Sequence, residues 1–119
     1  MEQPVWWYGT CVAVGDAAAV NLADLVTGRA AGSDVDVPYE GQTGAVVSLN
    51  FIADKNVIVG NNSAITADPA DGGGAVLQAD TAFTDSATGA TGNVIPLSQI
   101  YIFSETTDAT LTVFLRSLP

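Results

Sequence analysis

The sequence predicts an all-β protein, an antiparallel β-sandwich of jelly-roll-like form with an extended N-terminal segment. Strand-like runs recur about every 8–12 residues, which is the spacing typical of sandwiches and barrels. Hydrophobic residues make up 48% of the 119 residues and charged residues only 13%, a composition that favours a packed core. The length favours one domain. We therefore expect an N-terminal arm over residues 1–9 and a single sandwich domain over residues 10–119.

The first third of the chain leaves two interpretations open. Residues 16–28 fit a short helix with Asp16 as its N-cap and Gly28 as its end. They also fit an irregular strand, which the β-rich neighbouring segments favour. The apolar residues of that strand would be Val20, Leu22 and Val26.

The middle of the chain predicts several strands. Residues 44–53 alternate between two faces, which predicts a half-buried strand. Residues 57–59 and 75–78 predict shorter strands, each after a polar or glycine-rich turn. The stretch VDVPYEG around Pro38 predicts an edge strand or its end, and residues 84–92 predict an exposed loop. One face of the first strand would carry Val47, Leu49 and Phe51, and the other Ser48 and Asn50.

The most regular alternation lies near the C-terminal end. Residues 100–104 and 111–115 each alternate along the chain, and the polar turn Glu-Thr-Thr-Asp at residues 105–108 separates them. Two β-rich runs joined by a short polar turn predict an antiparallel hairpin. Both faces of these runs contain apolar residues, so we expect the hairpin at the centre of a two-layer structure.

Charge and composition exclude several functions. Three Lys and Arg against 13 Asp and Glu give a net charge of −10, so the chain lacks the basic surface that binds nucleic acid or an anionic membrane. Histidine is absent, which removes zinc–histidine sites and the Ser-His-Asp triad. The N-terminal MEQPVWWYG lacks the pattern of a signal peptide. We expect no enzymatic activity, no cofactor and no metal.

Two groups of polar or reactive residues have structural interpretations that we favour. Cys11 is the only cysteine, and we expect it to be a small buried hydrophobe. Acidic residues near each other in two loops could gather around calcium, but neither loop matches an EF-hand, which favours solvated turn carboxylates. These acidic residues are Asp34, Asp36 and Glu40 in one loop, and Asp68 and Asp71 in the other.

The consecutive aromatic residues Trp6, Trp7 and Tyr8 are the candidate partner-binding residues. In a strand, successive side chains point to opposite faces, so both tryptophans cannot face one core. Either the strand is buried on both sides, or an aromatic side chain points outward to a partner, since aromatic residues are enriched in interfaces. A stacking surface for sugar rings is a further alternative.

The chain also resembles a family of structural proteins. The runs at residues 93–118 (NVIPLSQIYIFSETTDATLTVFLRSL) and 46–67, with the acidic, Lys-poor, Ala- and Thr-rich composition, resemble the capsid decoration, or cement, proteins of tailed bacteriophages. The resemblance implies a small, commonly trimeric β-sandwich on the outer capsid surface of a virion. Its partners would be copies of itself and the major capsid protein, and no catalytic residue is implied. The alternative is a carbohydrate-binding or adhesin-type module.

Overall fold

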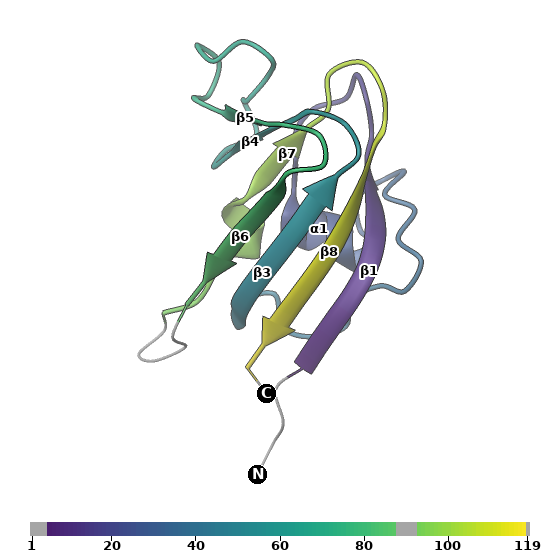
Figure 1. Ribbon diagram of the computed structural model, residues 1–119, viewed down its shortest axis with the longest axis vertical. Coiled ribbons are helices and arrows are strands. Elements are labelled where there is room, and N and C mark those ends of the chain that lie inside the picture. The colour runs from purple at the N-terminus through teal and green to yellow at the C-terminus, as the bar shows by residue number, and fades with distance from the viewer. Residues whose placement is uncertain (1–4, 88–92, 119) are drawn as a thin grey trace.

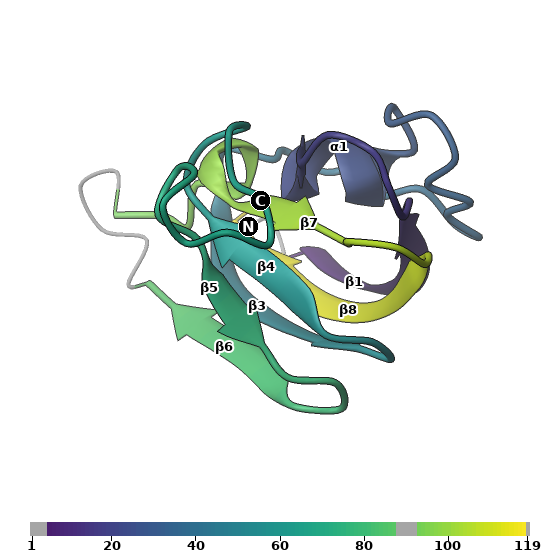
Figure 2. The ribbon, with the colours of Figure 1, turned by 90° about the horizontal axis from the view of Figure 1, so that it is seen from above.

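The protein is a sandwich of two four-stranded antiparallel sheets in a computed structural model, which describes residues 5–87 and 93–118 (Figures 1 and 2). The first sheet has the order β1-β8-β3-β6 and the second the order β2-β7-β4-β5. The strands of the first sheet are β1 (Val5–Ala13), β8 (Ala109–Ser117), β3 (Val46–Ala53) and β6 (Ala82–Ser86). Those of the second are β2 (Val20–Asn21), β7 (Tyr101–Phe103), β4 (Val57–Gly60) and β5 (Ala75–Leu77). The predicted all-β antiparallel sandwich is confirmed, and its jelly-roll-like form stays a prediction.

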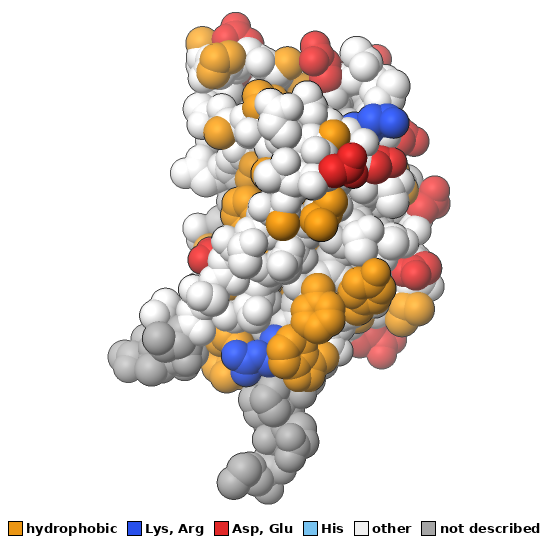
Figure 3. All heavy atoms as spheres, viewed as in Figure 1, with side chains coloured by type: hydrophobic (Ala, Val, Ile, Leu, Met, Phe, Trp, Pro, Cys, Tyr) orange, Lys and Arg blue, Asp and Glu red, His pale blue; other side chains and the backbone are white. Residues whose placement is uncertain are grey.

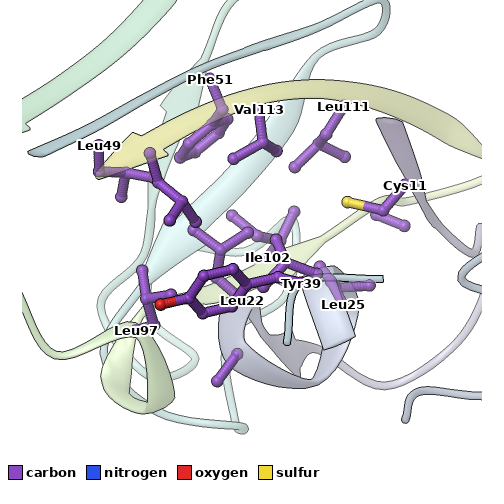
Figure 4. Packing of buried hydrophobic residues seen from close by; sticks show 14 of the residues in the cluster. Cys11, Leu22, Leu25, Tyr39, Leu49, Phe51, Leu97, Ile102, Leu111 and Val113 are labelled. Atoms are coloured by element: carbon purple, nitrogen blue, oxygen red, sulfur yellow. The ribbon is translucent and has the colours of Figure 1, made fainter. Parts of the chain in front are cut away.

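The core lies between the inner face of the first sheet and the layer behind it. Along β8, buried side chains alternate with side chains that point outward, as a strand with one covered face requires. The predicted alternation of β3 is confirmed, because Leu49 and Phe51 are buried while Asn50 is exposed. Figure 4 shows these side chains meeting Leu22, Leu25 and Ile102 from the opposite layer.

A short helix, α1 (Leu22–Thr27), covers the first sheet behind β1. It begins at Asn21, whose side chain accepts a hydrogen bond from the Asp24 N–H at 2.9 Å, and it ends at Gly28 in the left-handed conformation. The favoured strand interpretation of residues 16–28 is therefore wrong beyond the two residues of β2. Of the helical interpretation, Gly28 as the end is right and Asp16 as the N-cap is wrong. Hydrophobic burial decides the outcome, since Leu22, Leu25 and Val26 all face the core.

The predicted C-terminal hairpin is wrong, although both of its strands exist. β7 pairs with β2 and β4 in the second sheet, whereas β8 pairs with β1 and β3 in the first. Residues 104–108 carry the chain from one layer to the other, and the Gly15 N–H donates to the Asp108 carboxylate at 2.9 Å beside this crossing. A tight polar turn is compatible with both geometries, so the local pattern could not distinguish a hairpin from a corner.

The boundary predicted between an arm and a domain at residue 9 is also wrong for the described residues. β1 runs without a break from Val5 to Ala13 and pairs with β8 along its whole length, from Val5 opposite Ser117 to Ala13 opposite Ala109. Residues 5–9 therefore belong to the sandwich, and residues 1–4 of the predicted arm lie outside the described part of the chain.

Two other predictions change in the folded chain. Residues 82–86 form β6, so the expected loop at 84–92 begins later, and its residues 88–92 lie outside the description. The VDVPYEG stretch forms no strand, because Tyr39 turns inward and is buried beside Trp7. A 3-10 helix, η2 (Leu97–Gln99), precedes β7. Among the described residues, no helix has the length and apolar character needed to cross a bilayer.

Candidate functional site

The aromatic residues at the start of β1 divide between the two faces of the first sheet, as their positions in a strand predict. Trp7 points inward and is only 9% exposed, whereas Trp6 is 58% and Tyr8 64% exposed on the outer face. Of the predicted partner-binding residues, Trp6 and Tyr8 are therefore available at the surface and Trp7 is a core residue.

A third aromatic side chain completes this surface. Phe114 of β8 is 44% exposed and lies directly opposite Tyr8 in the strand register. Its ring centroid is 5.2 Å from that of Trp6 and 6.0 Å from that of Tyr8, both in edge-to-face geometry. We call Trp6, Tyr8 and Phe114 the aromatic face, and Figure 3 shows an apolar cluster in this part of the first sheet.

The inner side of β1 holds the aromatic face in place. The Trp7 indole N–H donates to the Val37 carbonyl at 2.8 Å, and its ring meets Tyr39 edge-to-face at 6.1 Å. Gly9 leaves room for this ring, because a Cβ at that position would lie 2.6 Å from Trp7 Cζ2. The strand that carries Trp6 and Tyr8 is thus anchored by the side chain between them.

The outer face of the first sheet carries a single charge in a chain whose net charge is −10. Its side chains are those that alternate with the buried ones along the four strands, and only Arg116 among them is ionised. The Arg116 guanidinium carbon lies 5.5 Å from the Trp6 ring centroid, within the range of a cation–π contact. The other outer-face residues are Thr10, Val12, Thr110, Thr112, Ser48, Asn50, Ile52, Ala82, Thr84 and Ser86.

Three of the acidic residues considered for calcium accept hydrogen bonds from protein groups. Asp68 accepts a hydrogen bond from the Ala70 N–H at 3.0 Å, and Asp71 accepts one from the Thr66 hydroxyl at 2.8 Å. Asp36 accepts from the N–H groups of Thr10 and Val37, and these bonds lower the pKa of its carboxyl group. Within the described ranges, no three side chains of His, Cys, Asp or Glu come together as a metal site would require.

Cys11 is fully buried on the inner face of β1, as predicted. Burial, with a smaller contribution from the nearby Asp36 carboxylate, raises the pKa of its thiol to about 12. A thiol in that environment stays protonated at neutral pH and is a poor nucleophile.

Two hollows of the described surface lie beside α1. One of about 550 Å³ is lined by residues 38–44 with Thr27 and Arg29, and Glu40 is its only carboxylate. Another of about 250 Å³ lies between β1, α1 and the loops beside them, and its lining is almost entirely alanine, valine, leucine and isoleucine. In the first hollow, the Thr27 hydroxyl donates to the Ala23 carbonyl and the Tyr39 hydroxyl to the Gln42 carbonyl.

Sequence reasoning found Trp6 and Tyr8 but missed Phe114 and Arg116. A signal was present, because Phe114 occupies a position in β8 where the outward residues before it are Thr110 and Thr112. An aromatic residue in a series of outward threonines indicates a surface contact. Its adjacency to Trp6, however, depends on the pairing of strands from opposite ends of the chain.

Comparisons of this chain with models of known protein families, with curated proteins and with solved structures find no match.

Proposed function

We propose that this protein is a structural, non-catalytic component of a phage particle, a capsid decoration protein that attaches to the outer head shell through the aromatic face. The aromatic face carries the proposal. Trp and Tyr are the residues that most often dominate the binding energy of protein interfaces, and here they lie together on a rigid sheet.

The distribution of charge supports attachment to a protein surface. The aromatic face and the polar, uncharged residues around it form a broad surface with only Arg116 ionised. Interface centres are depleted in charge and enriched in aromatic residues and arginine. Active sites are usually concave and lined by convergent polar groups. The aromatic face instead lies on one side of an open sheet.

Multivalency adds to this support. A decoration protein binds a lattice that repeats its attachment site, so modest affinity at each site gives high occupancy when copies are linked. The high negative charge keeps the free protein soluble before it attaches.

The test is co-sedimentation with undecorated heads assembled from the major capsid protein encoded beside this chain. The double variant Trp6→Ala with Phe114→Ala should weaken binding by at least about thirtyfold, which is the effect of losing the ~2 kcal/mol of one hot-spot residue. Val76→Ala is the matched control, since Val76 is 56% exposed but lies on the second sheet. Equal binding by the double variant and the control would contradict the proposal, as would the absence of a capsid gene nearby.

The second candidate is a carbohydrate-binding module, favoured by the exposure of Trp6 and Tyr8 and by the polar side chain of Asn50 on the other side of Phe114. Sugar rings stack on the flat face of an aromatic ring. Here Phe114 packs edge-to-face against both neighbours at 61° and 64°, so the three rings form no common plane. Glycan-array binding that is lost in Trp6→Ala would favour this candidate over the first.

A further inference from the structure

The free edge of β1 is covered along only half of its length. Next to the C-terminal half, the loop after α1 supplies partners, since the Val12 N–H donates to the Ser33 carbonyl at 2.6 Å and the Thr10 N–H to the Asp36 carboxylate at 3.2 Å. Beyond Asp36 the loop turns inward beneath the strand, where Val37 accepts from Trp7. The N-terminal half of the edge, at residues 5–9, is left uncovered by this loop.

Unpaired backbone groups lie along this uncovered half. In an antiparallel pair, alternate residues direct both backbone groups toward the partner strand, and the residues between them direct both groups away. The Thr10 N–H points away from β8, so Tyr8 and Trp6, two and four residues earlier in the same strand, also direct their N–H and C=O groups outward. Among the described residues these outward groups find no partner.

We propose that a second copy of this chain pairs with the uncovered edge, so that the two β1 strands lie antiparallel about a two-fold axis at Trp7. In this register Trp6 lies opposite the partner's Tyr8, and each exchanges its N–H and C=O with the other. The first sheets of the two copies then form one continuous sheet, and their aromatic faces become one larger surface on the same side.

The occupant is a second copy because the edge is complementary to itself. A two-fold axis at Trp7 brings together Trp6 and Tyr8, the described residues whose backbone groups point away from β8 and are left uncovered by the loop. The strand pairing about this axis ends at Thr10, because the Thr10 N–H is already bonded to the Asp36 carboxylate in both copies. Residues 5–9, Val-Trp-Trp-Tyr-Gly, carry no charge, so two molecules of charge −10 can approach here without opposing carboxylates in the paired strands.

The inference goes beyond attachment to a capsid and does not depend on it. It also differs from the trimer that the resemblance implies, because pairing of a strand with its own copy closes after two subunits.

Sedimentation equilibrium of the full chain tests the pairing. The wild type should have twice the mass of 12.1 kDa. Tyr8→Pro removes the outward N–H without removing a bond to β8, and it should raise the Kd of the dimer about tenfold or more above that of Tyr8→Ala, which retains the N–H. Thr84→Pro and Thr84→Ala, at the opposite edge of the sheet, should leave the dimer unchanged.

Three results would overturn the proposal. These are a wild type that stays monomeric up to its highest soluble concentration, a trimer, and equal effects of Tyr8→Pro and Tyr8→Ala. Hydrogen exchange in the wild type keeps the test decisive if a proline variant fails to fold. The Trp6 and Tyr8 amides should exchange more slowly as protein concentration rises, and exchange that is independent of concentration would contradict the pairing.

Discussion

The two sheets of the sandwich differ in length and in how they are held together. Three strands of the first sheet have eight or nine residues, whereas the strands of the second sheet have two to four. The first sheet forms a continuous ladder from β1 through β8 to β3, while the second depends on α1 and the loops to complete its layer. The difference indicates that the first sheet supplies the rigid framework and the second acts mainly as its cover.

This division explains where a binding surface can form. A sheet that is stabilised through its inner face can carry large apolar side chains on its outer face without losing its shape. One side of β8 is buried through Leu111, Val113 and Leu115. Phe114 points to the solvent from the other side of the same strand. The short strands of the second sheet offer no comparable surface.

The strongest test of the comparison is truncation of one core residue in each sheet. Phe51→Ala removes a fully buried ring that stacks on Phe83 at 4.9 Å, and it should lower the free energy of unfolding by about 4 kcal/mol. Ile58→Ala in β4 should cost about 2 kcal/mol, because Ile58 belongs to a small, separate cluster and is 9% exposed. Urea unfolding measures both values, and equal losses would remove the distinction between framework and cover.

The cap of α1 tests how much the covering layer depends on one local interaction. Asn21→Ala removes the acceptor for the Asp24 N–H, and the protein should lose about 1 kcal/mol of stability. Asn50→Ala is the control, since Asn50 is exposed on the first sheet and caps no helix. Thermal unfolding followed by circular dichroism compares the two, and a control that is as destabilised as Asn21→Ala would contradict the capping role.

One substitution in the first sheet should raise stability. Ser117 is completely buried at the end of β8, and its hydroxyl has no hydrogen-bond partner within the described residues. Ser117→Ala removes this unsatisfied group and should increase the free energy of unfolding by up to about 1 kcal/mol. Denaturant titration measures the free energy of unfolding of this variant and of the exposed control Ser86→Ala. A loss of stability in Ser117→Ala would show that the Ser117 hydroxyl makes a hydrogen bond in the folded protein.

The smallest effect is expected at the loop that covers the edge of β1. Hydrogen bonds from the N–H groups of Thr10 and Val37 lower the pKa of the Asp36 carboxyl group in the folded protein. The ionised carboxylate therefore stabilises the fold at pH values above about 4, the pKa of an aspartate in the unfolded chain. That contribution is lost as the pH falls through the lower pKa of the folded state. Asp36→Asn should therefore narrow the difference in stability between pH 7 and pH 3. Asp34→Asn, two residues earlier, serves as the control, and identical pH profiles for both variants would contradict the assignment.

The sequence predicted the strands better than their partners. The alternation in residues 44–53 correctly placed Leu49 and Phe51 inside, and the run Trp6–Trp7 correctly required opposite faces. The hairpin at the C-terminal end was wrong, because residues 105–108 form a corner between layers instead of a turn within one sheet. Residues 16–28 were misjudged for a similar reason, since burial against β1 favours a helix where the neighbouring β patterns favoured a strand.

The candidate site shows the same division. Trp6 and Tyr8 were identifiable from three consecutive aromatic residues, but nothing local connects them to Phe114 or to Arg116. The open edge of β1 was also beyond sequence reasoning, because it depends on where the loop carrying Asp36 leaves the strand.

By itself, the sequence determined the all-β class, the alternation of faces along single strands, the burial of Cys11 and the lack of a basic surface. These properties follow from the two-residue period of a strand and from composition, both of which are local. Only the tertiary structure decided that β7 and β8 belong to different sheets, and that β1 and β8 bring Trp6, Tyr8 and Phe114 together. Strand pairing between distant segments depends on the combined burial of the whole core, which no short stretch of sequence contains.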